Sequence, residues 1–301
     1  MNAAVTPEPG VDGRALAAFF GCAAVWGSTF IAISFGNDAL PPLWAASLRL
    51  GLASVLLTTL TRATGHALPS GPALRAAVQF GFLNFGIGFC LLYWGELYVP
   101  TGITAVMFAT VPLTTAVASL AVGLERPSPL TLLAAGVALA GVAMLFSSEL
   151  RHAVPLLPLL AILASATCGA LSGVALKRGP RQHPLGANAA AAIVGLAVCL
   201  TGSFLRHEAH PLPATAGALL PLAYLTVVGS IGAFVLYAWL VNQWPVTRIS
   251  FIAVIVPVIA TVLGALLRHE SITLMSVAGS ALVLSGVVLA LTAGRRTRVT
   301  R

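Results

Sequence analysis

Long apolar runs, separated by short polar stretches, follow one another along almost the whole chain. Each run holds about 18 or more residues, which is enough for a helix to cross the hydrocarbon core of a bilayer. The pattern therefore predicts an all-α membrane protein with ten transmembrane helices and no sizeable water-soluble domain. The expected spans are 15–35, 43–61, 73–94, 101–122, 129–147, 154–176, 185–205, 214–240, 247–267 and 272–292.

The second half of the chain repeats the pattern of the first. A constant offset of 145 residues pairs residue types that chance seldom places alike: Trp94 with Trp239, Pro100 with Pro245, Pro112 with Pro257 and Glu125 with Glu270. The earlier spans match less well, at an offset of 142. Two copies of a five-helix unit are therefore predicted. Because five is odd, the second copy crosses the membrane in the opposite sense, and such inverted repeats suit alternating access around a site near the midplane.

This repeat sets the expected divisions of the chain. We expect a cytoplasmic N-terminal tail at 1–14, a first five-helix repeat at 15–150, a second at 151–292 and a basic cytoplasmic tail at 293–301. The first span is too long, and its flank too acidic, for a cleaved signal peptide. We expect it to remain as the first helix.

Composition and charge agree with a membrane location. The chain is 58% hydrophobic and 8% charged, whereas soluble domains carry roughly 25% charged residues. Its net charge of +8 arises from Lys and Arg that fall, in this topology, mainly on the side of the N-terminus. That bias predicts a multi-pass protein of the inner (plasma) membrane with both termini in the cytoplasm. The basic residues thus indicate lipid-bilayer topology, and no nucleic-acid partner is expected.

Several segments carry a family resemblance. WGSTFIAISF at 26–35, PPLWAASLRLGLA at 41–53 and GVALAGVAML at 136–145 resemble an EamA-type member of the drug/metabolite transporter superfamily. The resemblance implies a ten-helix carrier that moves small metabolites, often amino acids and often outward. The sequence departs from the family at Cys168-Gly169, where an aromatic-Gly pair is usual.

Two prolines stand near the middle of equivalent spans. Pro112 and Pro257 each remove a backbone donor and crowd the carbonyl four residues earlier. We expect a pair of hinged helices facing the transport site, although membrane helices also tolerate proline as a kink without function.

Polar and aromatic side chains recur at helical spacing on the spans expected to face the centre. Such faces line cavities, but small polar residues also form close-packed seams between helices, and aromatic stripes also face lipid or core. The candidate substrate-cavity residues are Trp26, Ser28, Thr29, Asn84, Phe85, Phe89, Tyr93, Thr104, Phe108, Ser165, Cys168, Ser172, Ser230, Phe234 and Tyr237.

Arg49 is the only formal charge well inside a predicted span. An arginine at such depth faces a partner, a cavity or an interface. It is a candidate for contact with an anionic substrate group or for gating, with anchoring by snorkelling as the alternative. Its counterpart at the 142 offset is Ala191, so any role is one-sided.

Glu125 and Glu270 fall in tight turns on opposite sides of the membrane. Each is a candidate either for capping or pairing with its neighbours or for a gate contact that breaks during transport. No carboxylate or imidazole stands at mid-depth, so coupling through a buried Asp or Glu is not expected. Facilitated transport, exchange and coupling through a group at a span end stay open.

Motifs for other chemistry are missing from the sequence. It contains no Walker motif, no HExxH zinc site and no nucleophile elbow, and its four cysteines lie separately within spans. We expect no catalytic residues, no metal and no cofactor. The leading hypothesis is a secondary transporter of small neutral or zwitterionic metabolites. An intramembrane enzyme and a non-transporting membrane assembly factor are the alternatives. Ten helices suffice for a monomer, although the sequence does not fix the oligomeric state.

Overall fold

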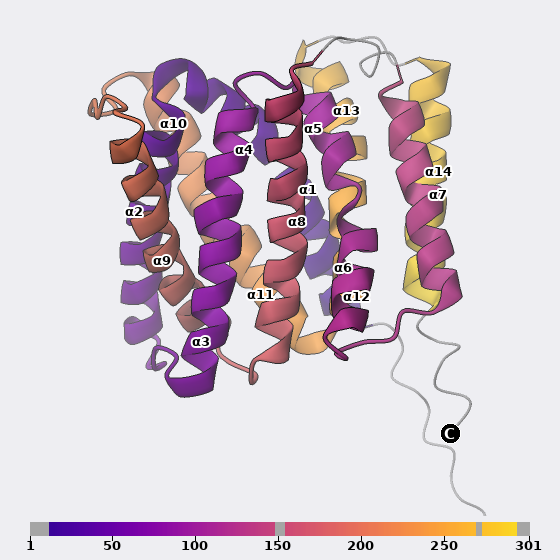
Figure 1. Ribbon diagram of the computed structural model, residues 1–301, viewed down its shortest axis with the longest axis horizontal. Coiled ribbons are helices and arrows are strands. Elements are labelled where there is room, and N and C mark those ends of the chain that lie inside the picture. Colours follow the sequence, from indigo (N-terminus) through magenta and orange to yellow (C-terminus); the bar gives the residue numbers. More distant parts are fainter. Residues whose placement is uncertain (1–11, 148–153, 269–272, 294–301) are drawn as a thin grey trace, which may run out of the picture.

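The fold was analysed in a computed structural model that describes residues 12–147, 154–268 and 273–293, which contain helices and no strand. The helices run side by side through one bundle, with α7 and α14 at one edge and α2 and α9 at the other (Figure 1). We call the side where α1 begins the N-terminal face and the opposite side the far face. Nine spans in the described residues are long and apolar enough to cross a membrane, and the shorter apolar helix α7 provides a tenth. The expected ten-helix fold is confirmed.

Six spans are single continuous helices. They are α1 (Gly13–Ala39), α2 (Pro42–Ala63), α7 (Pro129–Leu145), α8 (Leu156–Arg178), α9 (Pro184–Leu205) and α14 (Leu274–Ala293). Their starts follow helix-cap chemistry: proline opens α2, α7 and α9, and the Ser128 hydroxyl accepts the backbone N–H of Thr131. The proline signals explain why the expected and observed boundaries agree closely.

The third and eighth spans each contain a π-helical segment. The third comprises α3 (Gly71–Phe80), η1 (Gly81–Gly88) and α4 (Phe89–Gly95). The eighth comprises α10 (Ala216–Tyr224), η3 (Leu225–Ala233) and α11 (Phe234–Gln243). An offset of 145 carries 81–88 onto 226–233, so the two segments coincide except for Leu225. π-helices are rare, and their recurrence at one register supports the two-repeat architecture.

The change of offset from 142 to 145 has a simple origin. The connection after α2 comprises residues 64–70, whereas the equivalent connection after α9 comprises residues 206–215. The second is three residues longer, which is the difference between the two offsets.

The fourth and ninth spans are broken, but not at equivalent places. The fourth consists of α5 (Thr101–Phe108) and α6 (Val111–Ala121), and Pro112 lies in the first turn of α6. The ninth consists of α12 (Val246–Ile249) and α13 (Ile252–Arg268), and Pro257 lies inside α13. The break at Ser250–Phe251 is four residues, about one helical turn, earlier than the repeat predicts. Pro257 therefore differs from the expected hinge, because the chain turns before it.

Close packing through glycines joins particular pairs of spans. A Cβ on Gly81 would collide with the Ala191 backbone, and one on Gly195 would collide with Phe85. These contacts bring α9 against the π segment of the third span, as small residues do between membrane helices. On the same pair of spans, the sulfur atoms of Cys90 and Cys199 lie 3.6 Å apart. The expectation that the cysteines are separate is wrong for this pair, because the inverted repeat brings α4 and α9 together.

Candidate functional site

A cavity lies between the two halves of the bundle. It is lined by residues of spans one, two, three and four of the first copy and of spans six, eight and nine of the second. About 970 Å³ of space within it, part of it open to solvent, is unoccupied by protein atoms.

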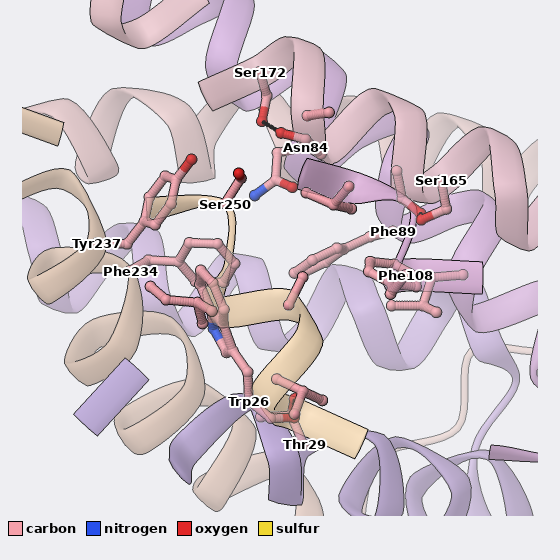
Figure 2. A pocket seen from close by; sticks show the side chains of 18 of the residues that line it. Trp26, Thr29, Asn84, Phe89, Phe108, Ser165, Ser172, Phe234, Tyr237 and Ser250 are labelled. Atoms are coloured by element: carbon pink, nitrogen blue, oxygen red, sulfur yellow. Dashed lines mark hydrogen bonds between the residues drawn. The ribbon is translucent and has the colours of Figure 1, made fainter. Parts of the chain in front are cut away.

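Many of the residues predicted from the sequence line this cavity (Figure 2). They are Trp26, Thr29, Arg49, Asn84, Phe89, Phe108, Ser165, Ser172, Phe234 and Tyr237.

Other predicted residues lie just outside the cavity. Phe85 is buried behind it and packs edge-on against Phe234, with ring centroids 4.6 Å apart. Ser28 points away from it and forms hydrogen bonds with the carbonyl oxygen of Val25 and the hydroxyl of Tyr224. Cys168 is not a lining residue, but the adjacent Gly169 is.

Thr104 is also outside the lining: the residue is fully buried, and its hydroxyl has no hydrogen-bond partner among the described residues. Tyr93 and Ser230 do not line the cavity either. Both act on it indirectly, through Arg49.

Aromatic side chains form a continuous wall through the site. Trp26 lies 5.1 Å from Phe234 and 5.4 Å from Tyr237 between ring centroids. Phe89 lies 6.3 Å from Phe234, which extends the wall toward Arg49. These rings come from spans one, three and eight, so the wall crosses between the two copies. It suits an apolar or aromatic ligand.

The Arg49 guanidinium is held in a fixed position. Its Nε donates to the Ser230 hydroxyl at 2.8 Å, and Nη1 donates to the Tyr93 hydroxyl at 3.1 Å. The guanidinium carbon stands 4.7 Å from the centroid of the Phe89 ring, a cation–π distance. Gly229 makes room for this group, because a Cβ there would lie 3.1 Å from Nη2. The arginine is therefore packed into the protein and does not reach water at the membrane surface.

Two polar side chains of the cavity lack partners. The indole N–H of Trp26 is buried without an acceptor in the described residues. The side-chain amide of Asn84 forms no hydrogen bond within that part of the chain, and it points into the cavity beside Ser250 (Figure 2). Unpaired polar groups in an otherwise apolar site are available to a ligand.

The irregular parts of spans three, four and nine border the cavity. Asn84 and Gly88 belong to η1, Val111 follows the break in the fourth span, and Ser250 lies at the break in the ninth. Irregular backbone at membrane depth occurs where it is buried in protein or lines a cavity. Sequence reasoning missed Ser250, because its only signal was Pro257, seven residues further along the chain.

Glu125 forms a contact between the repeats at the N-terminal face. Its carboxylate accepts the backbone N–H groups of Val246 and Thr247 at 2.7 and 3.1 Å and the Thr247 hydroxyl at 2.7 Å. It thus caps α12 of the other copy, where a negative charge is favourable. The expected alternatives placed it against its own neighbours or in a gate, and the observed contact is a cap across the repeats. Glu270 lies outside the described residues.

Lys177 complements this cap. Its ammonium donates to the carbonyl oxygens of Val241 and Trp244 at 2.6 and 2.8 Å, at the end of α11. The corner between α11 and α12 is therefore held by a positive group at the C-terminus of one helix and a negative group at the N-terminus of the next.

Glutamates at the far face differ in their surroundings. Glu208 accepts the backbone N–H groups of Leu43 and Trp44 and the hydroxyl of Ser203. Both carboxyl oxygens of Glu96, one residue beyond the third span, are buried without a partner among the described residues. Burial holds the pKa of Glu96 well above its ordinary value.

No group of three His, Cys, Asp or Glu side chains in the described part of the chain is arranged to hold a metal ion. Nor is there an Asp, Glu or His among the cavity-lining residues within those ranges. The geometry is that of a binding cavity with one fixed cation.

A family comparison matches both halves of the chain. The model of the EamA-like transporter family covers residues 13–147 and 156–292. The chain belongs to the EamA-like transporter family. Its two matched segments coincide with the two five-helix copies seen in the structure.

The names of individual relatives of this EamA-like transporter agree with the family match. An Escherichia coli K12 protein named "Uncharacterized inner membrane transporter YedA" is 31% identical over 90% of this chain and 89% of its own. A Salmonella typhimurium LT2 protein named "Probable amino-acid metabolite efflux pump" is 24% identical over 88% of this chain and 90% of its own. A solved structure titled "Crystal structure of protein" matches with a TM-score of 0.77 at 19% identity, over 95% of this chain and all of that one. At that identity it supports the fold alone.

Proposed function

We propose that this membrane transporter is a secondary carrier of small metabolites, amino acids or related compounds, that works by alternating access. The observation that supports this most is the central cavity, which is lined by spans of both inverted copies. Inverted repeats that enclose a site near the midplane can rock against one another, so that the same site opens to either side.

The proposed orientation places the N-terminal face in the cytoplasm of the inner membrane. The distribution of Lys and Arg supports it. The names of the relatives, one an inner membrane transporter and one a probable efflux pump for amino-acid metabolites, support the location and suggest export. The lipid bilayer and a small-molecule substrate are then the partners of the chain.

Opening toward the cytoplasm requires the halves to separate at the N-terminal face. The Glu125 cap on Val246 and Thr247 joins the fourth span of one copy to the ninth of the other at that face. The breaks in both spans provide places where the main chain can change direction. We propose that the cap weakens and the breaks bend when the cavity opens to that side.

The alternatives lack a supporting observation. An intramembrane enzyme needs a positioned acid, base or nucleophile, and the described lining of the cavity contains hydroxyls without a neighbouring base. An assembly factor without transport activity would not need a central cavity lined by both copies.

The test is flux in proteoliposomes. Purified protein is reconstituted, and uptake of labelled amino acids and small carboxylic acids is followed with and without a pH gradient. Saturable uptake above that of empty liposomes supports the carrier. Absence of saturable flux for every compound in either direction contradicts it.

A matched pair of variants links that flux to the broken span. Pro112→Ala restores a backbone donor beside the break between α5 and α6 and is expected to lower the maximal flux more than the affinity. Pro129→Ala removes a proline from the first turn of α7, away from the cavity, and is expected to leave flux unchanged.

A further inference from the structure

We propose that Arg49 binds a carboxylate group of the transported molecule and thereby defines its class: small organic acids or amino acids with an apolar or aromatic body. This rests on the proposed carrier function and specifies the substrate of the same cavity. The argument depends on the charge of Arg49, its immobilisation and the character of the surrounding walls.

The charge of Arg49 has no counter-ion within the protein as described. The side chain is 2% exposed, and no Asp or Glu of residues 12–147, 154–268 and 273–293 lies close enough to form an ion pair with it. A buried arginine without a carboxylate is costly, and membrane proteins place such groups where a partner or a pathway requires them. A carboxylate brought by the substrate supplies the missing counter-ion.

The guanidinium also has donors to spare. Of its five N–H groups, Ser230 and Tyr93 accept one each. The remaining three N–H groups have no acceptor among the described residues, and Arg49 lines the cavity. A guanidinium presents paired N–H groups to a carboxylate in a planar fork, so both oxygens can be bound at once.

The surrounding contacts fix the direction of that fork. The two hydroxyls hold Nε and Nη1 from opposite copies, and the Phe89 ring lies against the guanidinium. Little rotamer entropy is left to lose on binding, and such pre-organisation raises affinity. A residue that only anchored its helix at the membrane surface would not need these three contacts.

The rest of the cavity accepts the body of the substrate. From Phe89, the aromatic wall continues through Phe234 and Trp26 to Tyr237. Asn84 and the indole N–H of Trp26 remain for additional polar groups. Aromatic faces and the Asn84 oxygen can receive the ammonium of an amino acid. Binding of an amine that has no carboxylate is disfavoured, because its positive charge is repelled by the positive charge of Arg49.

The asymmetry of the repeat agrees with this assignment. Ala191 occupies the position of Arg49 in the second copy and packs closely against Gly81, with no space for a ligand. One copy therefore provides the cation, and the other provides a sealed helix contact.

The test compares ligands that share a phenyl body and differ in whether they carry a carboxylate, an amide or an amine. Binding of 3-phenylpropanoate, L-phenylalanine, 3-phenylpropanamide and 2-phenylethylamine to the detergent-purified protein is measured by calorimetry, and flux of the same compounds is measured in proteoliposomes. The two carboxylates are expected to bind and to be transported. The amide is expected to bind at least about 30-fold more weakly, as expected from the loss of a buried charged pair.

Variants assign the effect to Arg49. Arg49→Gln is expected to lose the preference for carboxylate over amide, and Arg49→Lys, which keeps the charge without the fork, is expected to retain part of it. Arg206→Gln is the matched control, because this arginine lies against Trp94 at the far face and does not line the cavity. It should keep the full preference. If Arg49→Gln does not fold, Arg49→Lys and the ligand series with the unaltered protein still decide the matter.

The outcomes separate the two proposals. If the carboxylates bind in a way that depends on Arg49 but are not transported, the inference is supported and the proposed carrier function is contradicted. If the protein transports its ligands but binds the carboxylates and the amide equally well, the inference is overturned and the proposed carrier function is still supported. Failure of both carboxylates to bind also overturns the inference.

Discussion

The buried environment of the Glu96 carboxyl group could not be predicted from the sequence. From the sequence, Glu96 is an acid at the end of a span, where water is expected. In the structure its oxygens are buried beside the turn that carries Tyr93, and they receive no hydrogen bond within the described residues. Nothing in the local sequence signals this, because the burial comes from packing of distant elements, such as Pro158 and Ile162 of α8 around Gly95.

Glu96 predicts a specific dependence of stability on pH. Burial raises its pKa in the folded protein, so the folded state holds this proton more tightly than the unfolded state. The resulting stability is complete below the unfolded-state pKa of about 4.3 and is lost as the pH rises toward the folded-state pKa, at about 1.4 kcal/mol per pH unit. Glu96→Gln, which cannot ionise, is expected to be more thermostable than the original protein at neutral pH, and the difference should vanish near pH 4.

Thermal unfolding in detergent across this pH range measures the effect. Glu208→Gln is the control at the same face and should lower stability at neutral pH, because Glu208 accepts hydrogen bonds from α2 and Ser203. A destabilised Glu96→Gln protein at neutral pH would contradict the prediction.

Arg49, in contrast to Glu96, could be recognised from the sequence as a candidate site residue. A single charge in an apolar run is visible in the sequence, and the structure places it at the cavity. Its partners Tyr93 and Ser230 were visible as members of aromatic and polar stripes, but the bonds that join them to Arg49 required the fold.

Among the elements, the starts and ends of helices were the most predictable feature. Prolines at helix starts, such as Pro129 and Pro184, fix these boundaries through local chemistry. The π segments η1 and η3 and the break at Ser250 were not predictable, because they depend on packing between spans. A proline in the middle of a span indicated irregularity, but in the ninth span it did not locate the break.

The corner between α11 and α12 carries a prediction of its own. Glu125→Gln removes the negative charge that caps α12 and is expected to destabilise the protein by about 1 kcal/mol. Because this cap joins the copies at the N-terminal face, the variant should also be digested more readily by a protease added to that face. Thermal unfolding in detergent and limited proteolysis of oriented vesicles measure the two effects.

Arg126→Gln serves as the comparison for this cap, since Arg126 is an exposed residue of the same turn. Equal effects of the two substitutions would show that the cap on Val246 and Thr247 contributes nothing of its own.

For the whole molecule, the repeat could be predicted from the sequence, but the way in which its two copies pack together could not. The offset of 145 residues between matching Trp, Pro and Glu positions predicted two five-helix copies, which the family match and the structure support. It did not predict that the halves interlock, so that α9 of the second copy packs against the third span of the first. The pairing of Cys90 with Cys199 follows from this interlocking.

That pairing tests which parts of the transporter move together. The contacts of Gly81 and Gly195 pack α9 closely against the third span of the other copy, so we expect these two elements to keep their contact while other parts of the two copies separate. Oxidation is therefore expected to join Cys90 and Cys199, lowering the number of titratable thiols from four to two, without loss of flux. Thiol titration under denaturing conditions and proteoliposome flux before and after oxidation provide the measurement.

Cys199→Ala should keep all three remaining thiols under the same oxidation. Flux that stops on oxidation and returns with a reductant would show that the two helices slide during transport, against this prediction.

The π segments also bear on the ancestry of the chain. The same uncommon distortion occupies the same register in both copies, so it is most simply an inheritance from one ancestral five-helix protein whose gene was duplicated and fused. Because the two copies now face opposite ways, two molecules of such an ancestor would have had to lie antiparallel in the membrane to form the same bundle.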